Sequence, residues 1–214
     1  MHRLIDTGLE QLTSLVYKMG EEAQRALELA IDSYVNSKDS TESVREISDI
    51  LGAMSLEVEN KAFELIAKYQ PVASDLRIIK SYMKIAYDFD RYGRYALDTS
   101  YIGDRLGGLK ECDAWMRDFV TEMSEKVLSM VKTSLESLRS FDAMLARAIT
   151  QTENEVDKMY FNYLDKLIQE APATGKCTIS SVLVIRYLER IADHATYICE
   201  SIVYLSTGEK ITLR

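Results

Sequence analysis

Two carboxylates in the C-terminal part of the chain, Glu189 and Asp193, have the spacing of neighbours on one helix face. They lie four residues apart, which is about one helical turn, and apolar residues recur around them at steps of three and four over 182–202. Two like charges at the edge of a buried stripe repel each other unless a cation lies beside them. The pattern therefore requires a nearby source of positive charge.

A second acid pair with the same spacing, Glu153 and Asp157, lies earlier in the chain. If the helices that carry the two pairs run antiparallel across the short connection between them, all four carboxylates converge. Clusters made only of oxygen ligands suit Mg²⁺, Mn²⁺ or iron, and bridging carboxylates favour more than one metal. The sequence thus offers a candidate metal site formed by Glu153, Asp157, Glu189 and Asp193.

Basic side chains are the alternative source of positive charge. Acids four residues apart are common on solvated helix faces, where they pair with Lys or Arg, and Arg186 and Arg190 are close enough in sequence to do so. The acids adjoin the apolar stripe, however, and an unpaired buried carboxylate is costly, which favours a metal. Both interpretations stay open.

Other reactive residues give little indication of catalysis. We expect His194 to form a hydrogen bond on the surface or between helices rather than to bind a metal, and the absence of any Glu-x-x-His motif argues against a ferritin-type centre. No nucleophile or phosphate-loop motif occurs. Cys112, Cys177 and Cys199 are widely spaced without a Cys-x-x-Cys pair, so we expect all three to be reduced, with Cys199 in the core.

Composition limits the class of protein and of partner. The 214 residues are 47% hydrophobic and 28% charged, which is enough for a sizeable core, and no apolar run is long enough to cross a bilayer. The first residues carry an acid where a secretion signal would be apolar, so we expect an intracellular protein. The net charge of −8 opposes direct binding of nucleic acid and suits a basic protein surface or metal cations.

The elements that must position the acids are long helices. Two prolines, nine glycines and apolar spacings of three and four predict an all-α protein with long helices. The first five are expected near 4–34, 40–71, 73 or 74 to 104, 111–138 and 142–170, and the sixth runs from a cap at Thr178 or Ser180 to about Gly208. Gly107 and Gly108 mark the expected boundary between two halves, 1–106 and 109–214. Each half contains three helices, which predicts a twofold repeat of three-helix bundles.

Three stretches resemble motifs of the PhoU family, the phosphate-transport accessory proteins and regulators of phosphate signalling. They are LIAKYQPVASDLR at 65–77, YLERIADHA at 187–195, which is similar to the LERIGD motif found once per half, and ESIVYLSTGE at 200–209, which is similar to the usual C-terminal ending. Six helices in two repeats cover the chain in the same order. The resemblance implies two pseudo-symmetric three-helix bundles, each binding a multinuclear metal cluster through Glu/Asp-x-x-x-Asp motifs on its second and third helices.

The first half departs from this family pattern. Asp90 keeps the first acid of the third-helix motif, whereas Arg94 stands where the second aspartate is expected. The distance from QPVASDLR puts Ser48 and Gly52 at the two positions on the second helix. One acid among four positions is too few to hold such a cation, so we expect this site to be lost, with Arg94 supplying the positive charge.

The resemblance also implies a function. PhoU proteins are non-enzymatic cytoplasmic regulators that contact the phosphate ABC transporter at the inner face of the membrane through its ATPase and, in many bacteria, a sensor histidine kinase. We therefore expect a homodimeric negative regulator of phosphate uptake and signalling, with a metal cluster of iron, zinc, magnesium or manganese in the second half only. Two alternatives remain: a helical accessory domain of another transporter or ion channel, and a metal-dependent phosphoester hydrolase.

Overall fold

Long amphipathic helices make up nearly all of the chain. The computed structural model describes residues 3–170 and 175–213. The helices are α1 (Asp6–Asn36), α2 (Thr41–Tyr69), α3 (Ala73–Leu106), α4 (Ala114–Ser140), α5 (Ala143–Glu170) and α6 (Lys176–Thr207), with a short 3-10 turn, η1 (Leu109–Glu111), between α3 and α4. No strand occurs in the described ranges, so the predicted all-α class with six long helices is confirmed.

The helix ends have identifiable causes. Each observed end lies within three residues of the prediction, except that α6 begins at Lys176 after a cap at Gly175, ahead of both predicted caps, Thr178 and Ser180. Helix α2 ends before Pro71, which lacks a backbone N–H, and Gln70 takes a left-handed conformation while its N–H donates to the Ile66 carbonyl at 3.0 Å. Helix α6 ends at Thr207, and the next residue, Gly208, has φ of 81° and donates its N–H to the Tyr204 carbonyl. The local chemistry of these residues is sufficient to place the boundaries.

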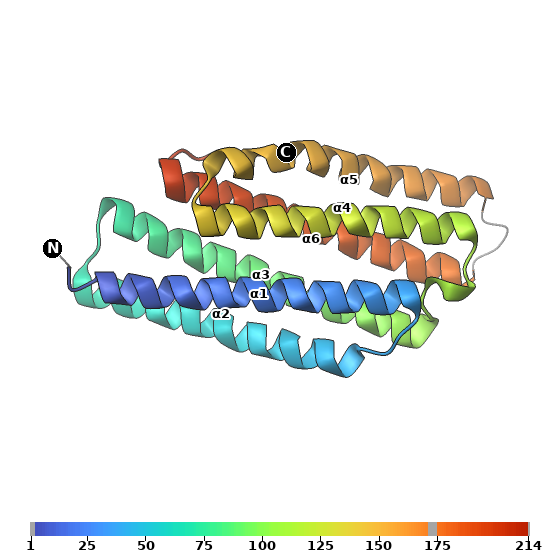
Figure 1. The fold of residues 1–214 in the computed structure, drawn as a ribbon, viewed down its shortest axis with the longest axis horizontal. Helices are drawn as coiled ribbons and strands as arrows, with labels where there is room; N and C mark the ends of the chain where they lie inside the picture. The colour runs from blue at the N-terminus through green and yellow to red at the C-terminus, as the bar shows by residue number, and fades with distance from the viewer. Residues whose placement is uncertain (1–2, 171–174, 214) are drawn as a thin grey trace.

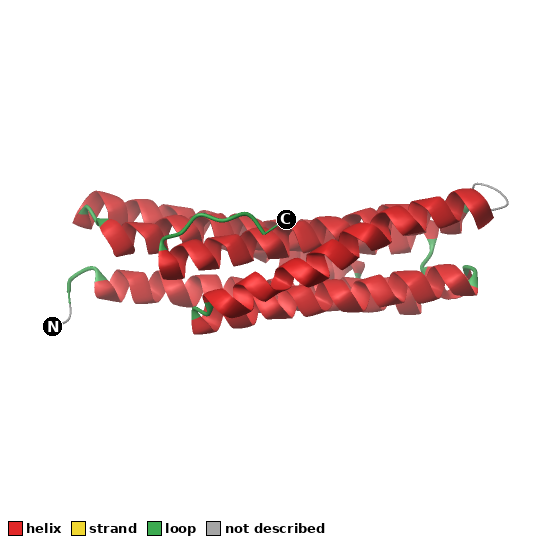
Figure 2. Cartoon of the chain, turned by 90° about the horizontal axis from the view of Figure 1, so that it is seen from above, coloured by secondary structure: helices red, strands yellow, loops and turns green. Residues whose placement is uncertain are grey.

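Two sets of three helices lie side by side along one long axis (Figure 1). Helices α1, α2 and α3 pack on one another, as do α4, α5 and α6, and the two sets meet through α3 against α6 and α1 against α4. The view in Figure 2 shows that all six helices run roughly along the same direction. No helix in the described ranges is long and apolar enough to span a bilayer.

The two halves bury equivalent positions. An offset of 104 residues matches α1 to α4, 105 matches α2 to α5, and 99 matches α3 to α6, as the burial of the matched residues shows. The matched pairs include Leu12 with Met116, Val16 with Val120, Met19 with Met123, Ala23 with Val127 and Leu27 with Val131; Val44 with Ile149, Ser48 with Glu153, Leu51 with Val156, Val58 with Tyr163 and Ala62 with Leu167; and Ile85 with Val184, Phe89 with Leu188, Tyr92 with Ile191, Gly93 with Ala192 and Ala96 with Ala195.

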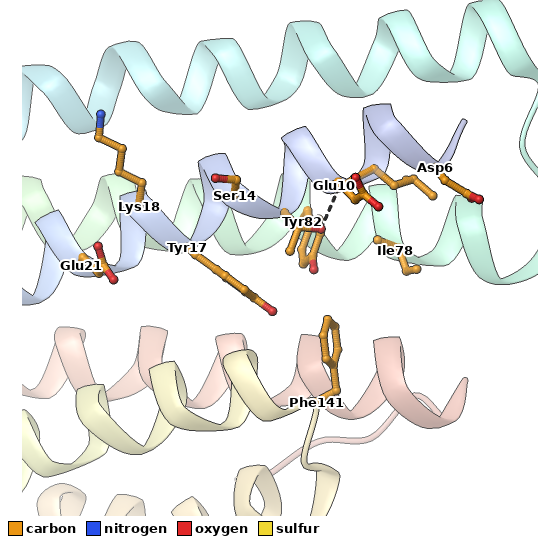
Figure 3. Close-up of a pocket in the computed structure, with 11 residues that line it drawn as sticks. Asp6, Glu10, Ser14, Tyr17, Lys18, Glu21, Ile78, Tyr82 and Phe141 are labelled. Atoms are coloured by element: carbon orange, nitrogen blue, oxygen red, sulfur yellow. Dashed lines mark hydrogen bonds between the residues drawn. The ribbon is translucent and has the colours of Figure 1, made fainter. Parts of the chain in front are cut away.

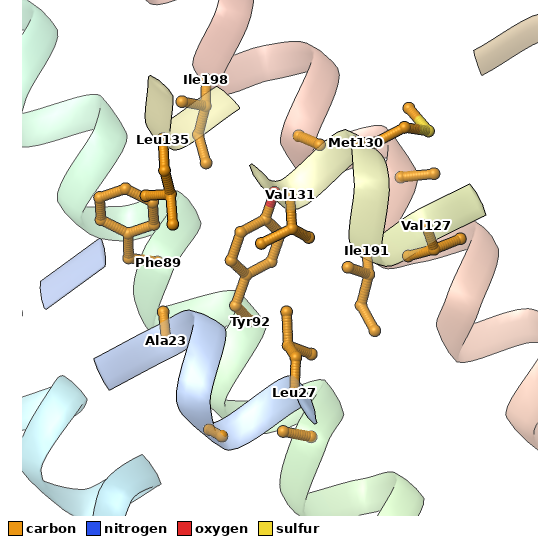
Figure 4. Packing of buried hydrophobic residues seen from close by; sticks show 14 of the residues in the cluster. Ala23, Leu27, Phe89, Tyr92, Val127, Met130, Val131, Leu135, Ile191 and Ile198 are labelled. Atoms are coloured by element: carbon orange, nitrogen blue, oxygen red, sulfur yellow. The ribbon is translucent and has the colours of Figure 1, made fainter. Parts of the chain in front are cut away.

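One apolar core runs between the halves. Figure 4 shows Leu27 of α1 and Tyr92 of α3 facing Val131 of α4 and Ile191 of α6. All four side chains are at most 1% exposed. Fully burying an aliphatic side chain of this size contributes about 1.5–3 kcal/mol to stability, so residues of both halves hold α3 against α6.

A disulfide joins Cys112 to Cys177, whose Cα atoms lie 5.5 Å apart. The expectation that all three cysteines are reduced is therefore wrong for this pair. The fold brings the residue after η1 beside the first turn of α6 although 65 residues separate them, and neither motif nor spacing reveals such a contact. Cys199 is a free thiol in the core, as expected.

Candidate functional site: the carboxylate seam between α5 and α6

Helices α5 and α6, which carry the predicted acids, run antiparallel and pack on each other (Figure 1). The Thr196 hydroxyl of α6 donates to Glu153 Oε2 of α5 at 3.0 Å, which fixes the register of the two helices. We call Glu153, Asp157, Glu189 and Asp193 the carboxylate seam.

The four carboxylates differ in burial. Glu153 and Asp193 are 2% and 7% exposed, Glu189 is partly buried, and Asp157 is exposed at the outer edge of the seam. Asp157 still lies close enough to raise the pKa of Glu189 through its charge. The seam therefore runs from the bundle interior at Glu153 to solvent at Asp157.

Two arginines compensate the acids of α6. Arg186 Nη1 lies 2.6 Å from Glu189 Oε2, and Arg190 Nε lies 3.8 Å from the same oxygen. Arg190 Nη1 also lies 3.5 Å from Asp193 Oδ2. In this structure, arginines rather than a metal supply the positive charge beside Glu189 and Asp193.

The compensation of Glu189 is incomplete. Burial raises the pKa of its carboxyl, the charge of Asp193 raises it further, and Arg186 and Arg190 only oppose these effects. Glu189 Oε2 is also buried without a hydrogen bond of good geometry, although Arg186 is in ion-pair contact with it. The Glu189 carboxylate is the least satisfied group of the seam.

In this structure, the described residues of the carboxylate seam do not have the geometry of a metal-binding group. Across residues 3–170 and 175–213, no three or more His, Cys, Asp or Glu side chains form a group that could hold a metal ion. Asp157 points outward from the core and Glu153 is hydrogen-bonded to Thr196. The donor types suit a hard cation, but with Arg186 and Arg190 in place the side chains do not fit a cluster.

The corresponding positions of the first half also face one another. Arg94 Nε donates to Asp90 Oδ2 at 2.9 Å, and a Cβ atom at Gly52 would lie 3.5 Å from Asp90 Oδ1. Ser48 is buried on α2, and its Cα would lie 3.4 Å from a Cβ at Gly93. The helix offsets pair Ser48, Gly52, Asp90 and Arg94 with Glu153, Asp157, Glu189 and Asp193, respectively. An arginine thus neutralises the one acid that remains.

Sequence reasoning missed Asp88, which makes a buried contact between helices. His194 Nδ1 lies 2.8 Å from Asp88 Oδ1, and this buried pair joins α6 to α3. The pair agrees with the expectation that His194 bonds between helices. Burial raises the pKa of Asp88, while the hydrogen bond from His194 acts in the opposite direction. No signal in the sequence could have placed Asp88 beside a histidine 106 residues away.

A separate groove opens where α1 and α3 face the connection between α4 and α5. It has a volume of 640 Å³, and its charged lining residues are Asp6, Glu10, Lys18 and Glu21. Figure 3 shows Phe141 pointing across the groove toward the side chains of α1 and α3. The groove contains neither histidine nor cysteine, and it does not adjoin the carboxylate seam.

Comparison with known proteins gives a consistent result. The family model described as the PhoU domain matches residues 16–102 and again 120–202. A protein of Clostridium acetobutylicum named "Phosphate-specific transport system accessory protein PhoU homolog" is 32% identical, covering 99% of this chain and 98% of its own length. A protein of Pseudomonas aeruginosa with the same name is 30% identical, covering 95% and 85%.

Solved structures share the fold. The crystal structure of PhoU from Pseudomonas aeruginosa superimposes with a TM-score of 0.89 at 28% identity, covering 96% of this chain and 100% of that one. The phosphate transport system regulatory protein PhoU from Streptococcus pneumoniae superimposes with a TM-score of 0.86 at 23% identity, covering 97% and 99%. The predicted six-helix architecture is thus that of these two proteins.

Proposed function

The chain belongs to the PhoU family, and on that basis we propose that it regulates phosphate uptake and phosphate signalling. One observation carries the proposal: the similarity to phosphate-specific transport accessory proteins extends over 99% of the chain and 98% of the relative, and it includes both repeats. A regulator needs surfaces for partners rather than a catalytic centre. The proposed role is therefore that of a non-enzymatic binding protein.

We propose the ATPase of the phosphate ABC transporter as the main partner, with a sensor histidine kinase as a second one. The ATPase is the cytoplasmic part of such a transporter, so the regulator acts in the cytoplasm, at the inner face of the membrane. The net charge of −8 supports association with basic protein surfaces, where opposite charge accelerates encounter. Binding restrains uptake when phosphate is plentiful.

We infer that the domains are two repeats, 1–106 and 109–214. The burial offsets of the helix pairs support this division, and each stretch matched by the family model lies inside one repeat. A homodimer is the expected assembly, and light scattering of the purified chain measures it.

Metal binding by Glu153, Asp157, Glu189 and Asp193 stays a separate prediction, and no step of the proposed function depends on it. Iron, zinc, magnesium or manganese could enter only after Arg186 and Arg190 turn away from the acids. Elemental analysis of protein purified without chelators checks the prediction. About one equivalent or more of metal per chain, lost in a Glu189→Ala variant, would support it.

Gene deletion in the host tests the proposed role. We expect phosphate uptake and a phosphate-starvation reporter to stay high in phosphate-rich medium when the gene is removed, and to return to low values when it is restored. Normal repression in the deletion strain would contradict the proposal. A strain complemented with an unrelated helical-bundle protein controls for expression effects.

A further inference from the structure

A hollow of 570 Å³ lies between α3 and α6, the helices through which the two halves meet. We call it the α3–α6 hollow. A smaller space of 210 Å³ shares Lys84 and Glu200 with it and continues along the same two helices. The lining residues of the hollow are Lys84, Tyr87, Asp88, Arg91, Tyr95, Arg190, His194, Tyr197 and Glu200.

The basic side chains Lys84 and Arg91 lie at the surface of this hollow. The Lys84 ammonium lies 5.6 Å from the centre of the Tyr197 ring, and the Arg91 guanidinium lies 4.8 Å from that of Tyr95 and donates to its hydroxyl at 2.8 Å. No ion pair joins Lys84 or Arg91 to a carboxylate of the described residues, although the charge of Lys84 lowers the pKa of Asp88. Aromatic rings hold both cations in place, and together with Arg190 these cations outnumber the two acids of the lining, Asp88 and Glu200, which favours an anionic ligand.

His194 also lines the hollow, and it is 9% exposed. Its Nδ1 is engaged with Asp88 Oδ1 at 2.8 Å, so Nε2 is the ring nitrogen that remains for a ligand. The rings of Tyr87, Tyr95 and Tyr197 surround the imidazole at centroid distances of 6.4, 5.8 and 5.5 Å. The imidazole is therefore fixed in orientation by contacts on several sides.

The carboxylate of Asp88 gives independent evidence for a ligand in the hollow. Its side chain is 2% exposed, and its Oδ2 is buried without a hydrogen-bond partner. A buried carboxylate oxygen without a donor is unusual in a folded protein. A ligand of this hollow therefore needs anionic oxygens for the cations and one O–H donor for Asp88.

We propose that the α3–α6 hollow binds inorganic phosphate. The dianion of inorganic phosphate retains one P–O–H group, which donates to Asp88 Oδ2, while its ionised oxygens accept hydrogen bonds from Lys84 and Arg91. Sulfate has the same charge and nearly the same size but carries no proton, so Asp88 repels it. A phosphate monoester loses its second proton near pH 6 and then also lacks the donor.

The inference rests on the groups of the hollow and not on the proposed regulatory role. Its consequence is conformational, because α3 belongs to the first half and α6 to the second. A ligand that contacts both helices stabilises one relative placement of the two halves. Phosphate binding then alters the affinity for any partner whose binding surface includes both halves.

Histidine NMR offers a direct test, because the chain has only two histidines, His2 and His194. The purified full chain with labelled histidine is titrated at pH 7.5 with sodium phosphate, sodium sulfate or AMP at constant ionic strength. We expect the His194 resonances to shift saturably with inorganic phosphate, with at least about tenfold weaker binding of sulfate and AMP. Equal shifts with sulfate, tighter binding of AMP, or no shift with phosphate would overturn the proposal.

Variants assign the effect to named groups. Asp88→Asn should reduce the preference for phosphate over sulfate by about tenfold, because an amide donates to either anion. Lys84→Gln combined with Arg91→Gln should weaken phosphate binding by at least about tenfold. Lys84 is exposed and Arg91 is half-exposed, so this double variant should fold and can replace Asp88→Asn if that variant does not fold. Lys132→Gln, an exposed charge on α4, is the matched control and should leave binding unchanged. Unaltered binding in the double variant would place the ligand elsewhere.

A chain that binds its transporter ATPase but no phosphate would refute this inference and leave the proposed function standing.

Discussion

At the scale of single residues, positive charge beside buried acids is the recurring feature of the structure. Arg94 neutralises Asp90 in the first half, and Arg186 and Arg190 lie against the acids of α6 in the second. The three arginine side chains are 37–58% exposed, so each ion pair contributes modestly to stability. The arginines nevertheless decide whether the seam has room for a cation.

Removing both arginines of the seam tests their role. In Arg186→Gln combined with Arg190→Gln, we expect a loss of up to about 2 kcal/mol in the free energy of unfolding, because Glu189 and Asp193 lose their compensating charges. Thermal unfolding measures the loss, which corresponds to a decrease of several degrees in Tm. Arg139→Gln, whose partner Glu21 is exposed, is the control and should change Tm very little. The opposite ranking of the two variants would contradict this account.

The buried hydrogen bond from Thr196 to Glu153 gives a second residue-scale prediction. Thr196→Val keeps the shape of the side chain and removes the donor, so Glu153 loses a partner in the interior. A hydrogen bond to a charged group contributes about 1.5–3 kcal/mol, and urea unfolding should show a destabilisation of that order. Thr99→Val removes a hydroxyl that only donates to the Tyr95 carbonyl of its own helix, and it should cost less. An equal loss of unfolding free energy in the two variants would mean that the hydrogen bond between α5 and α6 contributes no more than one within a helix.

At the scale of helices, local sequence was sufficient for most boundaries. Apolar spacing and the glycine and proline positions predicted all six helices, and every end except the start of α6 to within three residues, because these signals act inside one element. The Cys112–Cys177 bond and the Asp88–His194 pair were not predictable, because each joins residues far apart in sequence. For Glu189, the sequence left open whether arginine or a metal supplies the positive charge. Residue spacing places acids and arginines on a helix, but it does not show the direction in which a long side chain extends.

Close approach of α2 and α3 at Gly93 can be tested directly. A Cβ at this position would lie 2.7 Å from Leu51 Cδ1 and 3.4 Å from Ser48 Cα, so the larger side chain of Gly93→Val forces the helices apart. We expect a destabilisation of about 1–3 kcal/mol in urea unfolding. Gly103→Val lies in the same helix, where the nearest atom is 3.5 Å away, and it controls for helix propensity. A smaller loss at Gly93 than at Gly103 would show that the two helices have space between them.

At the scale of the whole molecule, two like halves share one core and present an acidic surface. Tyr92, Leu27, Val131 and Ile191 come from both repeats, so a perturbation at the junction of α3 and α6 reaches each half. Composition and apolar periodicity predicted the repeat, but only the structure reveals that its halves join through α3 and α6. This junction is where a partner or a small anion could alter the relation between the repeats.

The measurement that tests the account most directly is equilibrium binding between the purified chain and the purified ATPase of the host's phosphate transporter. We predict a saturable complex that weakens as salt is raised from about 0.05 to 0.5 M, because the acidic chain meets a basic surface. The ATPase of an unrelated transporter from the same host serves as the control and should not bind. No saturable binding to the phosphate ATPase, or equal binding to both ATPases, would contradict the proposed function.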